Sequence, residues 1–406
     1  MKRSFFAITV ALMLILSVAG CAKEPLPTGS GGNGTEGGWI NASFNNADIA
    51  LSDTGCYHMV DSYFLYYVEI KSGIDICLCS KPGCLHDKNP DPTMLSECDA
   101  YIGGADRPFF WDEHIYFFVN DEYGTHIYSR DETGLSEKKI GSLGTRFTEE
   151  KKSVNVSYTA NVGGKLYYEA TVDSIQYNED RQESEVVQEL FYIGCMNLTT
   201  GKDETIIETT YPTFLVAAGE TGVIAYAYDT TGIDFEDPDY RAELEKRKSQ
   251  LMLWNAETGD KEILVEKTVK EFSNVECVSG TRVFCSSKYG EHWYYELKNG
   301  ETVPFVEGSV QYIGSRYALL SSDGKWKLLD LQTGQELQNE LKAESFASYA
   351  SNQEGFVLLY RLSKGEGKPL DRYFCFVAYK DLTDGLQKKD LTPLYSEISE
   401  IPNMHP

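Results

Sequence analysis

Basic residues are scarce in this sequence. Lys and Arg number 37 against 62 Asp and Glu, which gives the 406 residues a formal net charge of −25. A nucleic-acid ligand requires a basic surface that neutralises phosphates, and an anionic membrane surface attracts clusters of Lys and Arg. The composition therefore argues against both kinds of partner. We interpret the acidic surplus as a feature that keeps an exposed protein soluble.

Catalytic motifs and long apolar segments are missing as well. The sequence contains no Gly-x-Ser-x-Gly nucleophile elbow, no His-Glu-x-x-His zinc motif and no P-loop. Beyond the N-terminal signal, no apolar run approaches the roughly 20 residues that a membrane-spanning helix requires. These absences favour a binding protein over an enzyme.

The first 20 residues predict an export signal. Lys2 and Arg3 precede a mostly apolar run of 14 residues, from 5 to 18, which is too short for a membrane span and has the length of a signal-peptide core. The sequence Val18-Ala-Gly-Cys21 resembles the lipobox of bacterial lipoproteins, although Leu is commoner than Val at its first position. That resemblance implies cleavage before Cys21 and attachment of a diacylglyceryl group to its sulfur. An ordinary secretory signal is the alternative.

A Gly-rich segment follows Cys21. Residues 23–38 include six Gly together with Pro, Ser, Thr and Asn, so the segment has no apolar face to bury. We expect residues 21–38 to be a lipidated, flexible tether. It would hold a domain formed by residues 39–406 at the outer face of the cell membrane, with the membrane as one partner.

Strand signals fill the remainder of the chain. The 27 Tyr and 19 Phe residues alternate with polar residues in short stretches, which is typical of half-buried β-strands. One phrase recurs, in which a strand is followed by a polar turn that ends in Gly and then by another strand. The seven turns lie at 71–73, 132–134, 199–201, 257–259, 298–300, 332–334 and 383–385.

The spacing of these turns predicts the fold. From Gly73 to Gly385 the turn glycines lie 52 residues apart on average, and repeats of about 40–50 residues with four strands each are typical of β-propellers. We therefore predict an all-β fold with a single β-propeller of seven blades, with six or eight as alternatives. Two β-sandwiches would explain the strands but not the recurring turn. Loop insertions are expected around 173–189 and 237–250, the second with the Pro and charge spacing of a small helix.

This repeat resembles the propellers of bacterial lipoproteins that are grouped near the TolB-like and YWTD-like repeats. A second resemblance lies in Cys79-Ser-Lys-Pro-Gly-Cys84-Leu-His86, followed by Cys98-Asp-Ala-Tyr101. This C-x4-C-x-H…C phrase is similar to one found near the first blade of propeller lipoproteins from anaerobic Gram-positive, Firmicutes-type bacteria. The group is uncharacterised, so the resemblance implies a binding or scaffolding surface and no fixed chemistry.

Residues 77–98 also suggest a metal site on their own terms, because they hold four of the ten cysteines and one of the six histidines. The Lys-Pro-Gly-Cys sequence at 81–84 fits a type II turn, which would bring the flanking cysteines together. Four side chains of this segment match a Cys₃His site for structural zinc, with Cys77 as a spare. The candidate ligands are Cys79, Cys84, His86 and Cys98.

Disulfide formation is the main alternative for the same cysteines, since an exported protein can oxidise its thiols. Cys84 could pair with Cys98, or Cys79 with Cys84, and free thiols are the third option. The four cysteines at 195, 277, 285 and 375 lie in strand-like stretches, where we expect buried apolar side chains.

The predicted function is that of a non-catalytic, membrane-anchored extracytoplasmic lipoprotein whose propeller binds a protein, a peptide or a cell-wall glycan. The two predicted insertions would carry recognition, because loops on a rigid scaffold commonly do so. The alternative is an exported glycan or peptide hydrolase with catalytic carboxylates in the propeller channel.

Overall fold

The computed structural model describes residues 38–397 except for the segments 45–48, 61–62, 87–91, 122–123, 151, 179–182, 257, 308, 314–315, 323–324, 338–344, 353, 364–369 and 383–384. The predicted signal, Cys21 and all of the predicted tether except Gly38 lie outside the described residues. None of the helices in the described part is long and apolar enough to cross a membrane.

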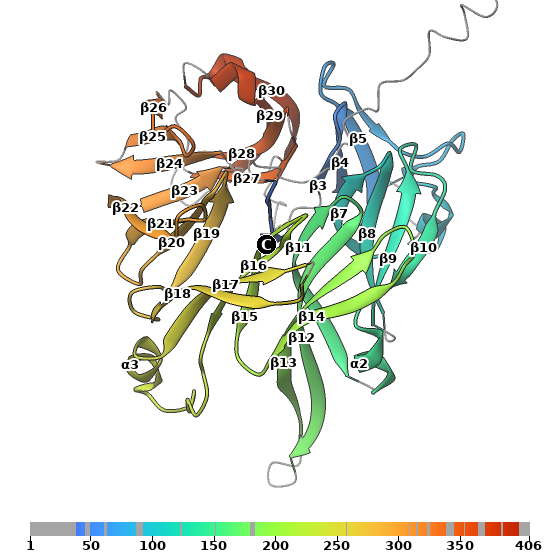
Figure 1. Cartoon of the computed structure of the whole chain (residues 1–406). Coiled ribbons are helices and arrows are strands. Elements are labelled where there is room, and N and C mark those ends of the chain that lie inside the picture. Colours follow the sequence, from blue (N-terminus) through green and yellow to red (C-terminus); the bar gives the residue numbers. More distant parts are fainter. Residues whose placement is uncertain are drawn as a thin grey trace, which may run out of the picture.

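Within these residues the chain forms seven antiparallel sheets arranged as a ring (Figure 1), which confirms the predicted all-β propeller with seven blades. Blades 1 to 4 contain β3 Ile49–Leu51, β4 Gly55–Val60, β5 Phe64–Glu69 and β6 Asp75–Cys77; β7 Ala105–Trp111, β8 His114–Asp121, β9 Gly124–Asp131 and β10 Lys138–Ser142; β11 Ser153–Val162, β12 Lys165–Asn178, β13 Glu183–Asn197 and β14 Asp203–Thr209; and β15 Thr213–Gly219, β16 Gly222–Tyr228, β17 Lys248–Asn255 and β18 Lys261–Thr268. Blades 5 to 7 contain β19 Asn274–Ser279, β20 Arg282–Ser286, β21 Glu291–Glu296 and β22 Glu301–Glu307; β23 Ser309–Ile313, β24 Tyr317–Ser322, β25 Lys325–Asp330 and β26 Glu336–Leu337; and β27 Ser345–Ser351, β28 Gly355–Ser363, β29 Leu370–Ala378 and β30 Leu391–Glu397.

The seven turn glycines identified in the sequence occupy one equivalent place in every blade, the connection between its third and fourth strands. All seven adopt positive φ, from 65° at Gly73 to 103° at Gly385. L-residues with a Cβ rarely adopt this conformation, so each turn requires Gly. The recurring phrase therefore marks one hairpin per blade, which is why it gave the correct number of blades.

Two short strands at the N-terminal end of the described chain were not predicted. β1 Ile40–Asn41 pairs with β15 of blade 4, and β2 Ser43–Phe44 pairs with β11 of blade 3. The Asn41 side chain also donates to the Val278 carbonyl at 2.9 Å and accepts from the Val278 N–H at 2.6 Å. Residues 40–44 thus line the inner edges of blades 3 to 5, near the centre of the ring (Figure 1), and blade 1 begins only at Ile49.

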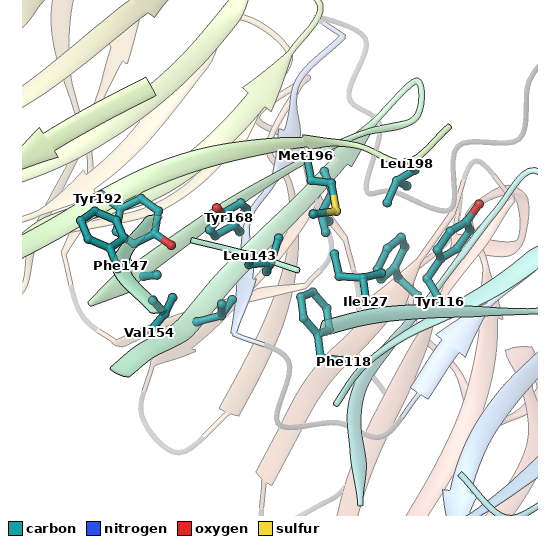
Figure 2. Packing of buried hydrophobic residues seen from close by; sticks show 14 of the residues in the cluster. Tyr116, Phe118, Ile127, Leu143, Phe147, Val154, Tyr168, Tyr192, Met196 and Leu198 are labelled. Atoms are coloured by element: carbon teal, nitrogen blue, oxygen red, sulfur yellow. The ribbon is translucent and has the colours of Figure 1, made fainter. Parts of the chain in front are cut away.

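Blades pack through apolar faces, as the contact between blades 2 and 3 shows (Figure 2). Phe118 and Ile127 of blade 2 face Tyr168 and Met196 of blade 3, and all four side chains are fully buried. Burying such a side chain contributes about 1.5–3 kcal/mol, so each interface stabilises the ring without a continuous hydrogen-bonded sheet.

Ring closure between blades 7 and 1 also uses side chains. His58 of β4 stacks on Tyr395 of β30 with ring centroids 4.1 Å apart, and its Nε2 lies 3.1 Å from an Asp75 carboxylate oxygen. The Asn352 amide donates to the Ser52 carbonyl at 3.0 Å, across 300 residues of sequence. Within the described residues, blades 1 and 7 are each built from one continuous stretch of chain.

One carboxyl group is buried between blades 3 and 4. Glu169 of β12 is 3% exposed, and its carboxylate accepts the N–H of Leu215 in β15 at 2.8 Å, beside a bulge in that strand. Desolvation raises the pKa of Glu169 to about 8, against the opposing effect of the Leu215 hydrogen bond. The side chain thus satisfies a backbone donor that the bulge displaces from the ladder.

The described residues contain two short α-helices, α2 Thr145–Glu149 and α3 Tyr240–Glu245, together with the 3₁₀ turns η2 Pro92–Glu97, η3 Tyr379–Leu382 and η4 Lys388–Asp390. α3 confirms the small helical insertion predicted near 237–250, and β17 begins already at Lys248. The insertion predicted at 173–189 is an extension of the β12–β13 hairpin, which reaches beyond the other strands.

Candidate metal centre

The segment between β6 and β7, residues 78–104, carries the four candidate ligands; we call it the Cys/His loop. The predicted type II turn is present, since the Cys84 N–H donates to the Lys81 carbonyl at 3.3 Å and Gly83 has φ of 74°. η2 follows, and the Cys98 N–H donates to the Leu95 carbonyl at its end. These two tight turns place three thiols on the same side of the loop.

The loop brings all four predicted residues together. One ligand atom from each of Cys79, Cys84, His86 and Cys98 lies within 4.8 Å of every other, and the Cys98 sulfur is 3.5 Å from Nδ1 of His86. Ligand atoms of a tetrahedral zinc site are separated by roughly 3.5–3.8 Å, given bonds of about 2.0–2.3 Å. These four side chains can therefore hold one metal ion.

His86 reaches this position through an uncommon backbone conformation. Its φ is 52°, in the left-handed region that residues with a Cβ seldom occupy. Such conformations are retained where surrounding contacts or function require them. Here the conformation brings Nδ1 of His86 within reach of the Cys98 sulfur.

The pKa values of the Cys79 and Cys98 thiols are shifted in opposite directions. Burial raises the pKa of Cys79, but hydrogen bonds from the N–H groups of Lys81 and Asp99 and from neighbouring thiols outweigh it, so the net pKa is lowered. The pKa of Cys98 is raised, chiefly by desolvation and further by its hydrogen bonds with Cys79 and Cys84. Of these two thiols, Cys79 therefore loses its proton more readily to form the thiolate that a metal requires.

Polar contacts fix the Cys/His loop to blade 2. The Asp99 carboxylate accepts the Ser80 N–H at 3.2 Å and hydroxyl at 2.6 Å, and lies 3.2 Å from the Lys81 ammonium. Arg130 of β9 donates to the carbonyls of Asp99 and Tyr101 at 2.6 and 2.8 Å. The Asp99 contacts thus tie the start of the loop to its end, and Arg130 holds that end on blade 2.

Other cysteines and histidines lie elsewhere. Cys77 belongs to β6 and is outside the four-ligand group. The cysteines at 277, 285 and 375 are buried as predicted, whereas Cys195 is only partly buried; the described cysteines form no disulfide bonds with one another. His126 is buried and bonded to Ser142 and Asp121 at 2.8 and 3.0 Å, a network that the sequence did not indicate.

The connections of the propeller divide between two faces. The first strands of successive blades, such as β11 and β15, pack together around the centre, and adjacent strands in every blade are antiparallel. Connections from second to third strands therefore share one face with connections between blades. That face, which we call the insertion face, carries the extended ends of β12 and β13, the connection 229–247 with α3, and the Cys/His loop. The seven glycine turns lie on the opposite face.

The N-terminal end of the described chain also lies on the face opposite the insertions. β1 runs antiparallel to β15, which places Gly38 beside Gly219 at the turn between β15 and β16. A Cβ added to Gly219 would lie 3.2 Å from the Gly38 carbonyl oxygen. Residues 40–44 then lead toward the insertion face.

Comparison with known proteins supports the fold and leaves the function open. No family model and no curated protein matches the chain. Similar solved structures include a puromycin-hydrolysing peptidase from Mycobacterium tuberculosis, with 10% identity and a TM-score of 0.54 over 94% of this chain and 57% of that chain. An acylaminoacyl peptidase in complex with Z-Gly-Gly-Phe-chloromethyl ketone matches with 13% identity and a TM-score of 0.51, over 89% of this chain and 53% of that one. TolB from Acinetobacter baumannii has 11% identity and a TM-score of 0.37 over 81% of this chain and 75% of that one.

The chain spans 57% and 53% of the two peptidases that it resembles. At such identities the likeness shows the propeller fold alone.

Proposed function

We propose that this chain is a membrane-anchored extracytoplasmic lipoprotein whose propeller binds a protein, peptide or glycan partner through the insertion face, without catalysis. Lipid on Cys21 would provide the anchor, and residues 21–38 the tether. In this proposal Cys79, Cys84, His86 and Cys98 hold a structural zinc ion that shapes the Cys/His loop.

The observation that carries the proposal is the separation of the two faces. The three longest described elaborations of the ring share the insertion face, whereas Gly38 lies on the opposite face beside Gly219. A tether attached at Gly38 would direct the insertion face away from the membrane. Loops on a rigid scaffold are a common place for recognition, and here the scaffold presents them together.

The test compares shortened insertions in a lipid-free protein that begins at residue 38. In one variant, Asn-Gly replaces 174–187, so that Asp173 and Gln188, which already pair, flank a two-residue hairpin turn. In the other, a Gly/Ser linker replaces 231–243 and keeps Glu245, which bonds Lys288. Binding to isolated cell envelopes is measured by cross-linking and mass spectrometry, with Asp53→Asn on the opposite face as the control.

We expect both shortened variants to stay folded and to lose their cross-linked partner, while the control retains it. Unchanged partner binding in both shortened variants would show that the insertion face is not the recognition surface. Turnover of a glycan or peptide by the purified protein would contradict the non-catalytic assignment.

A further inference from the structure

A cavity of about 670 Å³ lies between the Cys/His loop and blade 2. Ligand pockets commonly have volumes of about 300–1,000 Å³. Phe117 and Val119 of β8 and Tyr128 of β9 line one side, with alternate side chains that all face blade 1. The Cys/His loop lines the other side, and one candidate metal ligand, Cys98, is part of that wall.

The basic groups of this cavity are already occupied by the protein. Arg130 donates through all three of its nitrogens, to the carbonyls of Asp99, Gly134 and Tyr101 and to the Glu137 carboxylate. The Lys81 ammonium bonds the Glu97 carbonyl and pairs with Asp99. Arg130 is therefore a positioning residue that holds the wall in place, and neither cation is available to a ligand anion.

Acidic and aromatic groups remain on the cavity surface. The Glu97 carboxylate makes no hydrogen bond to a described residue and interacts with the Lys81 ammonium through its charge, while only one oxygen of Glu137 bonds Arg130. Tyr101 and Tyr128 are half-buried aromatic residues of the lining, whereas Phe117 is only 1% exposed. A cation with an aliphatic stem matches this lining, because the stem packs on the rings while the charged group meets carboxylates. The formal charge of −25 on the whole chain also favours a positively charged ligand.

The mouth of the cavity suggests that the cation belongs to a polypeptide. Leu135, which lines the cavity, is 45% exposed. Tyr63, also 45% exposed, stacks on Tyr101 of the wall with ring centroids 6.1 Å apart. Exposed apolar side chains around a pocket offer contacts to residues that flank an inserted side chain.

We propose that this cavity binds a Lys or Arg side chain of a partner polypeptide. The inference deepens the proposed function, on which it rests, by naming the chemistry of the partner. Free polyamines share the same ammonium-and-stem chemistry, and the experiment separates the two sources.

The probe is a fluorescein-labelled nine-residue peptide with three lysines among glycines, compared with versions in which norleucine or Glu replaces each Lys. Binding is measured by fluorescence anisotropy with the metal-loaded protein from residue 38 onward. Glu97→Gln removes the carboxylate at constant shape, and Glu220→Gln on the opposite face is the matched control with the same change in charge.

We expect the Lys peptide to bind more tightly than the norleucine and Glu peptides. Glu97→Gln should lower the affinity for the Lys peptide about fivefold, as expected for the loss of one partly exposed charge contact. Glu220→Gln should leave the affinity unchanged. Competition by unlabelled Lys peptide but not by equimolar spermidine supports a polypeptide source, whereas equal competition would overturn that part of the inference.

Equal affinity for the Lys and norleucine peptides, or equal effects of the two Gln substitutions, would overturn the cavity assignment. If that occurs while the shortened insertions still abolish envelope binding, the inference fails and the proposed function stands.

Discussion

Replacing Glu169 by Gln removes a titratable group that the fold holds in an apolar setting between blades 3 and 4. The amide oxygen of Gln can still accept the Leu215 N–H that the carboxylate accepts at 2.8 Å. The substitution therefore changes the charge while it keeps the hydrogen bond at the β15 bulge. The difference between variant and wild type isolates the cost of ionising a buried carboxyl.

The direction and size of the expected change in unfolding free energy follow from the pKa of Glu169, which burial raises from 4.5 to about 8. Between these values the folded protein keeps a proton that the unfolded chain has lost, so the unfolding free energy falls as the pH rises. The stabilising contribution is complete below pH 4.5 and lost as the pH passes through 8. Each pH unit inside this window corresponds to about 1.4 kcal/mol, so the wild type should lose up to about 4 kcal/mol relative to Glu169→Gln between pH 5 and pH 8.

The assay is urea unfolding of wild type and variant at pH 5, 6.5 and 8, followed by tryptophan fluorescence and circular dichroism. Glu262→Gln, an exposed substitution in β18, is the control for the change in net charge and should give curves parallel to wild type. Parallel pH dependence for Glu169→Gln and wild type would refute the reasoning. So would a variant that is less stable than wild type at pH 8.

Four other outcomes test the structure. Zinc analysis of anaerobically purified protein should give one ion per chain, lost in both Cys84→Ser and His86→Ala; retained zinc in either variant would contradict the four-ligand site. Removal of the metal by a chelator should weaken binding of the Lys peptide, because the metal-bound loop forms one wall of the cavity. Unchanged affinity would show that the cavity does not depend on the metal site. Asn41→Ala should cost about 1–3 kcal/mol in urea unfolding, since it leaves two backbone groups of blade 5 without their partner. Gly201→Ala should lower the melting temperature more than Gly259→Ala, although the two glycines have similar φ angles of 70° and 74°. A Cβ added at Gly201 would lie 2.4 Å from a carbonyl oxygen of blade 2, whereas a Cβ added at Gly259 would have no described atom within 4 Å. Equal effects would mean that the conformational cost alone operates.

Local signals explain which features the sequence predicted. A turn glycine such as Gly201 is required by the backbone conformation of its own hairpin, so the need for it repeats with each blade and is visible without knowledge of the neighbours. The candidate metal ligands were also recognisable, because a tight turn fixes the distance between Cys79 and Cys84. The helix α3 followed from the Pro and the charge spacing, although its length was overestimated.

Features that depend on two distant segments could not be predicted. β1 and β2 contain two residues each, too few for a periodic pattern, and their partners lie more than 100 residues away. Glu169 is one of 62 acidic residues, and only the bulge opposite it explains its burial. The helix α2 was not predicted, because the residue at its N-cap position is Gly144, which has no side chain that could cap the helix.

The cavity beside the Cys/His loop shows why the metal ligands could be predicted from the sequence and the binding surface could not. Cys98 was identified from its spacing to other cysteines, yet its neighbour Asp99 matters through a carbonyl that receives Arg130 from the next blade. Nothing in the sequence around Arg130 distinguishes it from the other basic residues. Its role arises because the ring places the outer end of blade 1 against the middle of blade 2. A metal in the loop and an arginine in the blade would then hold neighbouring parts of one wall, at Cys98 and Asp99, so the shape of the cavity depends on both.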